Sequence, residues 1–177
     1  MNAYNIGVII GLIIGVVVGV GLLLLILIAT TKNHKVKRDY DERQELVRGK
    51  GFKYGFITMA AANMVISCTQ FIFYKPIADT WASMMLSLAL GVLVHVHYCI
   101  WNEGYFSLNE NKKVFMIIFA IMVLVQYAGA FDYLMNGGWI IDGMLTFRAV
   151  NLIAAIMITF ILVDLLIKNA YAKKEDE

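Results

Sequence analysis

The side chains best suited to chemistry lie in the stretch VHVHYC, where His95 and His97 precede Cys99, and at Asp164. Imidazole, thiol and carboxylate groups bind metals or carry protons. Residues two apart on a helix point about 200° apart, so His95 and His97 cannot face one ion, whereas His95 and Cys99 share a face. A zinc or haem site would need further ligands from other helices. The sequence therefore predicts no metal site and no cofactor.

Asp164 is expected at the same membrane depth as His95 and His97, which predicts a polar layer in the inner half of a bilayer. Two roles stay open for this layer. It can consist of interhelical hydrogen bonds alone, or it can serve as a proton path, since an acid and an imidazole at one depth are usual parts of such a path. Only Asn63 and Gln126 are expected near the middle of the membrane to extend it.

A second polar layer is expected toward the outer surface, where Arg148 can pair with Asp132 or Asp142. No nucleophile motif accompanies either layer: the chain lacks GxSxG, HExxH and a phosphate-binding glycine loop followed by Lys-Ser or Lys-Thr. The sequence therefore predicts no catalytic residue and favours a protein that is not an enzyme.

Composition defines the elements that must position these residues. The chain is 60% hydrophobic and only 16% charged, whereas soluble domains are about 45–50% apolar and about 25% charged. The apolar residues form blocks of about 20 residues, long enough to cross a bilayer as helices. We expect a single all-α domain, an integral membrane helical bundle of five transmembrane helices, with spans at 6–29, 54–74, 81–101, 114–134 and 149–167.

Charge predicts the orientation of these spans. Residues 32–53 form a basic loop that holds eight of the fifteen Lys and Arg residues. With this loop inside, thirteen basic residues lie on the inner side and only Lys75 and Arg148 on the outer side. The bias predicts a multi-pass protein of the cell membrane with its N-terminus outside and its C-terminus inside. Since the basic residues border apolar segments, no nucleic-acid partner is expected.

The first span carries a glycine at every fourth residue, at Gly7, Gly11, Gly15 and Gly19. This spacing places the glycines on one narrow groove where another backbone can approach closely. The groove can be the seam of a homo-oligomer, or it can pack a neighbouring helix of the same chain. We expect packing within the chain.

The basic loop itself is expected to form a short interfacial helix. Asp39 and Arg43 stand four apart, and Glu45 and Arg48 three apart, at spacings that allow helical ion pairs. The glycines of 49–51 are expected to end this helix before the second span begins. The loop can dock a cytoplasmic partner or can simply orient the protein by binding anionic lipid headgroups.

The segment DYDERQELVRGKGFKYGF in this loop resembles the juxtamembrane signature of small bacterial and archaeal membrane-protein families of unknown function. The resemblance implies a bacterial cell-membrane protein of four or five helices, encoded near a transcriptional regulator, and it supplies no catalytic residue. The matching positions are Asp41, Glu42, Arg43, Arg48 and Lys50.

Two functions follow as hypotheses. In the first, the protein is non-enzymatic and acts by association, through the basic loop and the glycine groove, with a partner that is a second copy, another membrane protein or a cytoplasmic regulator. In the second, it is a small transporter or channel component that uses the inner polar layer. Both place it in a lipid bilayer.

Overall fold

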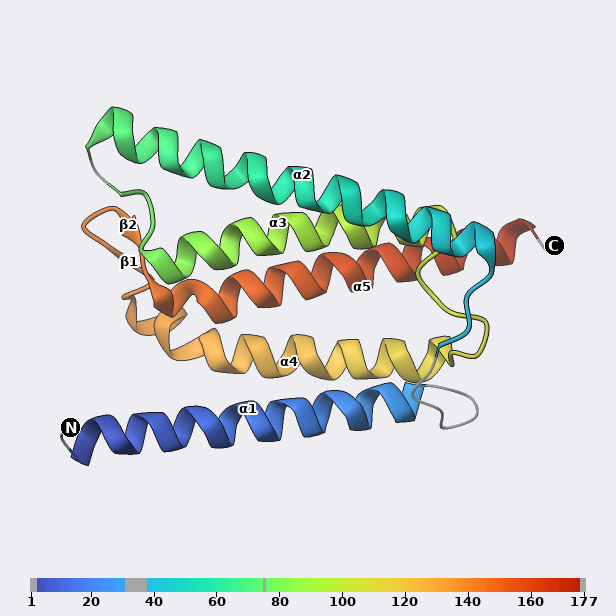
Figure 1. Cartoon of the computed structure of the whole chain (residues 1–177), viewed down its shortest axis with the longest axis horizontal. Coiled ribbons are helices and arrows are strands. Elements are labelled where there is room, and N and C mark those ends of the chain that lie inside the picture. The colour runs from blue at the N-terminus through green and yellow to red at the C-terminus, as the bar shows by residue number, and fades with distance from the viewer. Residues whose placement is uncertain (1–2, 31–37, 75, 176–177) are drawn as a thin grey trace.

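The computed structural model describes residues 3–30, 38–74 and 76–175. Within them the chain is almost entirely helical, as the sequence predicts. Its long helices lie side by side and run roughly along the same direction (Figure 1). A hairpin of two-residue strands and a 3-10 turn interrupt the helices before the last one. The elements are α1 (Ala3–Thr30), α2 (Glu42–Phe73), α3 (Thr80–Trp101), α4 (Lys112–Asn136), β1 (Ile140–Ile141), β2 (Met144–Leu145), η1 (Phe147–Ala149) and α5 (Val150–Glu175).

Four helical segments of the described residues are long and apolar enough to cross a membrane: α2, α3, α4 and the segment Phe147–Ala172, which contains α5. Helix α1 is 28 residues long and is apolar over most of its length. The prediction of a helical membrane protein is therefore confirmed. The number of spans and their orientation stay predictions.

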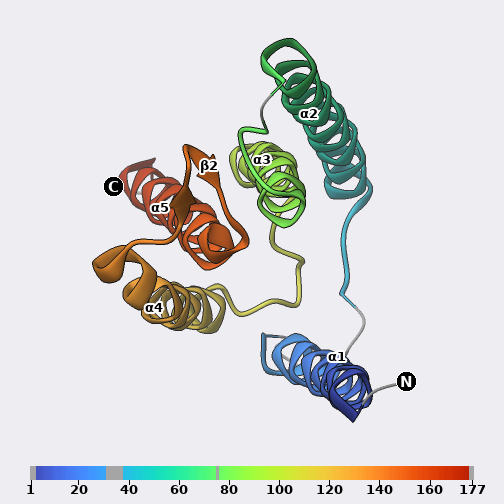
Figure 2. The ribbon, with the colours of Figure 1, turned by 90° about the vertical axis from the view of Figure 1, so that its left-hand side faces the viewer.

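The helices pack side by side in an open, curved row rather than in a closed ring. α2 packs on α3, α3 on α5 and α5 on α4, while α1 lies beside α4 with few contacts (Figure 2). Consecutive helices alternate in direction, so the N-terminus and the C-terminus lie at opposite ends of the molecule (Figure 1). We call the end where α2 and α4 begin the basic end, and the end that carries β1 and β2 the hairpin end.

Helix α2 begins earlier than the sequence predicts. Asp41 is its N-cap: the Asp41 carboxylate accepts a hydrogen bond from Gln44 N at 2.6 Å, and the Gln44 side chain accepts one from Asp41 N at 3.3 Å. This capping box starts a helix of 32 residues. The expected break at 49–51 is wrong, because the helix runs through both glycines, and residues 42–53 are part of α2 rather than of a loop.

The glycines at 51 and 55 allow α3 to lie close against α2. A Cβ at Gly51 would lie 2.8 Å from Cys99 Sγ, and one at Gly55 would lie 2.6 Å from Gly91 O. Such distances are too short for any side chain, so glycine permits close approach of the two backbones. Gly51 and Gly55 are the buried residues of α2.

The glycine repeat of α1 behaves differently. A Cβ built on Gly11, Gly15 or Gly19 would have no neighbour within 4 Å. The expected packing of this groove within the chain is therefore not present at these three positions. The surroundings of Gly7 lie outside the described residues.

The apolar core lies between α3 and α5, nearer to the basic end. Its buried residues are Val96 and Ile100 of α3 with Ile161 and Leu165 of α5. Aromatic side chains of the α3–α4 connection and of α4 pack against them, among them Phe106. The core thus fixes the α3–α4 connection against the end of α5.

Candidate functional site

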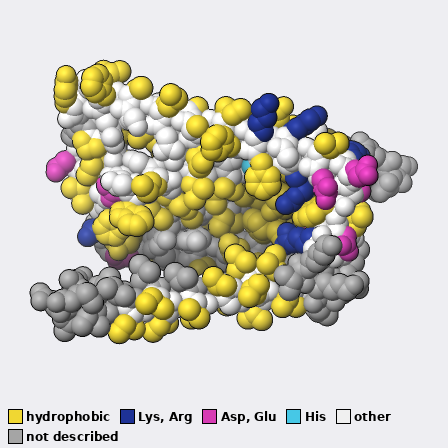
Figure 3. Space-filling view, in the orientation of Figure 1, with side chains coloured by type: hydrophobic (Ala, Val, Ile, Leu, Met, Phe, Trp, Pro, Cys, Tyr) yellow, Lys and Arg dark blue, Asp and Glu magenta, His cyan; other side chains and the backbone are white. Residues whose placement is uncertain are grey.

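Polar contacts concentrate at the basic end. Figure 3 shows most of the visible Lys and Arg side chains gathered there, while hydrophobic side chains cover much of the length of the helices. Three segments meet at this end: the start of α2, the α3–α4 connection of residues 102–111, and the last turns of α5.

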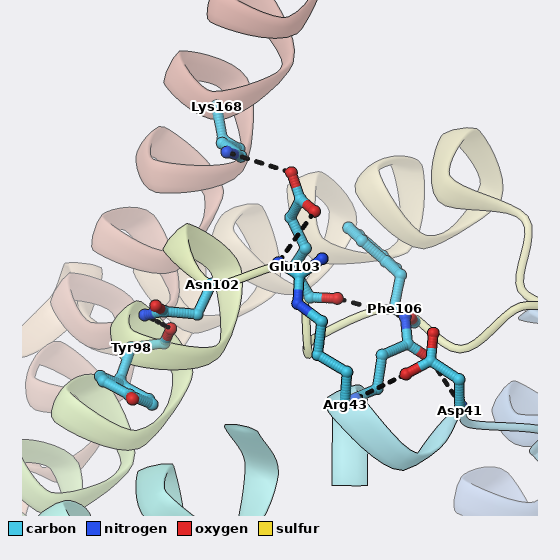
Figure 4. A network of polar contacts seen from close by, with 8 residues as sticks. Asp41, Arg43, Tyr98, Asn102, Glu103, Phe106 and Lys168 are labelled. Atoms are coloured by element: carbon cyan, nitrogen blue, oxygen red, sulfur yellow. Dashed lines mark hydrogen bonds and ion pairs between the residues drawn. The ribbon is translucent and has the colours of Figure 1, made fainter. Parts of the chain in front are cut away.

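Glu103 joins these three segments. Its carboxylate lies 3.3 Å from Arg43 Nη2 of α2 and 3.7 Å from Lys168 Nζ of α5 (Figure 4). Gln44 Nε2 donates hydrogen bonds to the backbone oxygens of Glu103 and Phe106, each at 3.1 Å. Glu103 adopts a left-handed backbone conformation, with φ 62°, which is uncommon for a residue other than glycine. Contacts from two helices hold it there.

A buried ion pair lies beside this cluster. Arg38 Nη2 is 3.0 Å from Glu110 Oε1, and the Glu110 side chain is only 1% exposed. The other carboxylate oxygen of Glu110 accepts a hydrogen bond from Ser107 N at 2.7 Å. Burial of a carboxylate this deeply is costly without such partners. The pair therefore ties the chain before α2 to the α3–α4 connection.

Backbone contacts strengthen the same junction. Leu108 N donates to Asp39 O at 2.9 Å, and Asp39 N donates to Asn109 Oδ1 at 3.3 Å. Asn109 Oδ1 also accepts a hydrogen bond from Ser107 Oγ at 2.8 Å. Residues 38–41 are thus held against residues 107–110.

An aromatic cluster underlies the junction. The rings of Tyr105, Phe106 and Phe115 meet edge to face, with centroids 5.1 to 5.7 Å apart, and Phe115 stacks on Phe119 at 4.8 Å. Burial raises the pKa of the Tyr105 hydroxyl well above its usual value, and the nearby Glu110 carboxylate raises it further. Tyr105 therefore stays neutral at physiological pH.

A cavity of about 430 Å³ opens among these segments. Glu103, Glu110, Lys112 and Lys168 supply charged groups to its wall, and apolar surface comes from residues such as Ile100, Phe106 and Leu165. This volume is within the usual range for small-ligand sites, about 300–1,000 Å³.

The inner polar layer forms only in part. His97 Nδ1 lies 2.7 Å from Asp164 Oδ2, so α3 and α5 are joined as one of the sequence alternatives predicts. The His97 side chain is 60% exposed, so the pair lies at the surface of the bundle. Trp101, one turn further along α3, has its ring 6.0 Å from that of His97.

His95 faces a different helix. Its ring stacks on Phe52 of α2 with centroids 4.1 Å apart, and its Nδ1 lies 3.8 Å from Cys99 Sγ. The expected divergence of His95 and His97 and the shared face of His95 and Cys99 are both present. In the part of the chain that the structure describes, no group of three or more His, Cys, Asp and Glu side chains is placed to hold a metal ion.

The charged residues of the basic segment have other partners than expected. Arg43 contacts Glu103 rather than Asp39, and Arg48 Nη1 donates to the Tyr40 hydroxyl at 2.8 Å with its guanidinium over the Tyr40 ring. Asp41 and Glu42 lie at the start of α2, as N-cap and first helical residue, and Lys50 is exposed on α2.

In the outer layer, one of the two expected partners of Arg148, Asp132, has a different contact. The Arg148 guanidinium lies 5.3 Å from the centroid of the Tyr133 ring, and Asp132 accepts a hydrogen bond from Asn136 Nδ2 at 2.7 Å. The described residues contain no ion pair between Arg148 and Asp132. Asp79 orders this end instead: it caps α3 through Ala82 N at 2.8 Å and also accepts from Phe147 N.

Sequence reasoning missed the residues that organise the basic end, above all Glu103 and Glu110. The sequence offered a partial signal, because NEGYFSLNENKK contains two acids and its loop is expected on the same side of the membrane as the basic segment. It also missed Gly51 and Gly55, although their spacing of four is the same as that of the glycines in the first span.

The fold and the composition define the chain as a helical membrane protein whose connections at one end are joined by a polar network. Comparison of the chain with known protein families, with curated proteins and with solved structures finds no match. The resemblance of residues 39–56 to small bacterial and archaeal families therefore stays an expectation.

Proposed function

We propose that this chain is a non-enzymatic, multi-pass protein of the cell membrane that acts by association, in an assembly or regulatory role. The observation that carries this proposal is the open face of α2. Among the described residues α2 packs on α3, and its only buried residues lie in its first half, at Gly51 and Gly55. The second half of this apolar helix leaves most of its side chains exposed.

Three polar residues of this second half share one face. Asn63, Ser67 and Gln70 are spaced by four and three residues, and all three are exposed. Asn63 Nδ2 donates to Met59 O of its own helix at 2.9 Å, so the amide oxygen remains available as an acceptor. Amide and hydroxyl groups in hydrocarbon form hydrogen bonds to a neighbouring helix where one is available. The polar stripe of α2, Asn63–Ser67–Gln70, therefore supports a helix partner.

A second copy of the chain satisfies this stripe. A two-fold axis along the membrane normal would bring the two α2 helices together at the same depth, with Asn63 opposite Asn63 and Gln70 opposite Gln70. An amide is both donor and acceptor and so pairs with itself. The part of the basic segment that belongs to α2, residues 42–53, would lie at the cytoplasmic surface, where a regulator can reach it.

Cysteine crosslinking in native membranes tests the contact. In a Cys68→Ser background, Ser67→Cys should form a disulfide-linked dimer on mild oxidation, because position 67 lies on the stripe. Val65→Cys is the matched control, since Val65 is also exposed but points about 200° away from Ser67. Asn63→Leu should weaken the Ser67→Cys dimer. Equal crosslinking at 65 and 67 would contradict a contact on this face, and a crosslink to a protein of different mass would replace the second copy by another membrane protein.

The alternative function, a small transporter or channel component, has one observation in its favour, the contact between His97 and Asp164. A proton path through this pair predicts proton flux in proteoliposomes that Asp164→Asn abolishes. Flux that is equal in the wild type and in Asp164→Asn would remove this alternative.

A further inference from the structure

We propose that the cavity at the basic end binds the phosphate group of an anionic phospholipid. This inference goes beyond association and rests on a different part of the molecule. Its first support is position. The cavity lies where α3 ends and α4 begins, so the membrane surface is expected at its mouth. Trp101 and Tyr171 follow and precede the lining residues Ile100 and Ala172 in the chain, and their ring centroids are 6.2 Å apart. Tryptophan and tyrosine prefer the headgroup level of a bilayer.

The charge around the cavity is the second support. The group of charges around the cavity comprises four cations and two carboxylates. The cavity wall itself holds Glu103, Glu110, Lys112 and Lys168 and is neutral. Arg43 and Arg38 pair with the two carboxylates from outside the wall, and Lys168 shares Glu103 with Arg43. Lys112 has no carboxylate partner in the described residues, and its Nζ lies 5.7 Å from the Phe106 ring centroid. The group carries an excess of two positive charges, which an anion would balance.

The start of α4 is the third support. Lys112 and Lys113 occupy its first turn, and that turn contains no acidic residue. The amino-terminal end of a helix already carries a partial positive charge, so two lysines there raise the electrostatic free energy. Asn111 Oδ1 already accepts hydrogen bonds from Lys113 N and Val114 N, so the Lys112 ammonium is the group of this turn that a phosphate would pair with. A phosphate beside Lys112 would offset the unfavourable charge.

The shape of the cavity distinguishes a lipid from a free anion. The cavity wall combines apolar side chains, among them Ile100, Phe106 and Leu165, with polar side chains such as Gln44 and Lys168. A bare phosphate cannot bury apolar surface, whereas the glycerol and first methylene groups of a phospholipid would cover the apolar part of the cavity wall. The mixed lining therefore favours a phosphate diester with an attached acyl glycerol.

Lipid retention by the purified full-length protein in detergent, measured by native mass spectrometry, tests the proposal. The probes are phosphatidylglycerol, which carries net negative charge, and phosphatidylcholine, which carries none. We expect phosphatidylglycerol to be retained with at least roughly tenfold higher affinity, and Lys112→Gln to reduce its affinity roughly five- to tenfold. Lys113→Gln is the matched control: it removes the same charge from the same helical turn but from a side chain outside the cavity wall.

A second variant tests the cavity without a change of charge. Ala172 lines the cavity from α5, so Ala172→Phe should fill it and reduce retention of phosphatidylglycerol while every lysine stays in place. Equal losses in Lys112→Gln and Lys113→Gln, full retention in Ala172→Phe, or equal retention of the two lipids would each overturn the proposal. Glycerol 3-phosphate or inorganic phosphate that displaces the lipid at equal affinity would identify a soluble phosphate as the ligand instead.

Discussion

Gly55 of α2 and Gly91 of α3 lie backbone against backbone. A Cβ on Gly55 would lie 2.6 Å from Gly91 O, and a Cβ on Gly91 would lie 2.8 Å from Gly55 O. The atoms in the way are backbone carbonyl oxygens, which cannot rotate away as a flexible side chain could. The crossing of α2 over α3 therefore depends on both glycines.

Gly91→Ala should destabilise the protein by about 1–3 kcal/mol, because one methyl group forces the two helices apart. The measurement is the free energy of unfolding in mixed micelles. Gly15→Ala in α1 is the control and should leave stability unchanged or slightly higher, since nothing lies within 4 Å of its added Cβ. Equal effects at both positions would mean that the helix crossing is not set by glycine.

The Arg38–Glu110 pair should be far more important for stability than the exposed pair of Arg43 and Glu103. Glu110→Ala leaves a guanidinium that is 24% exposed without its partner, and breaking a buried pair in this way costs about 3–5 kcal/mol. Arg43→Ala should cost at most about 1 kcal/mol, since its side chain is 70% exposed. The two variants are compared by the same unfolding measurement, and a cost for Arg43→Ala that equals that for Glu110→Ala would contradict the assignment.

His97→Ala and Asp164→Ala should be non-additive. Hydrogen bonds between membrane helices contribute about 0.6 kcal/mol on average and up to about 1.7 kcal/mol in double-mutant cycles. The short contact of 2.7 Å places this pair toward the upper value. A coupling energy of zero in the cycle would mean that the two side chains do not interact in the membrane.

Stability should fall at high pH through Tyr105. Its folded-state pKa is raised by burial, whereas the unfolded chain has a tyrosine pKa of about 10. Its contribution is therefore fully present below about pH 10 and is lost as pH rises from there toward the folded-state pKa. Tyr105→Phe should flatten this decline relative to the wild type between pH 9.5 and about 11. Parallel decline in both proteins would show that other groups, such as the lysines, dominate.

Impermeant thiol reagents test the predicted orientation. In the Cys68→Ser background, Asn2→Cys should be labelled from outside intact cells, and Lys174→Cys only after permeabilisation. The alternation of helix direction and the bias of basic residues toward one end both support this outcome (Figure 1). The reverse pattern would overturn the topology of five spans with the N-terminus outside.

Part of the site could be predicted from periodicity alone. Helical spacing separates His95 from His97 and joins His95 to Cys99, and equal depth brings Asp164 to His97. Periodicity gives no information on connections that are not helical. The roles of Glu103 and Glu110 depend on how residues 102–111 fold against the start of α2, which no local pattern encodes.

The sequence by itself determined that the chain is a helical membrane protein, where most of its apolar segments lie, and that most of its basic charge gathers at one end. These properties depend on the length of apolar segments, which must match the thickness of the bilayer, and on the charge beside them, which sets orientation. Tertiary structure decided what each glycine does. A Cβ on Gly51 would clash with Cys99 and His95 of α3, while a Cβ on Gly15, in an identical spacing pattern, would meet nothing within 4 Å. Identical spacing gives different outcomes because close packing requires a second helix at the right distance, and only the folded chain supplies one.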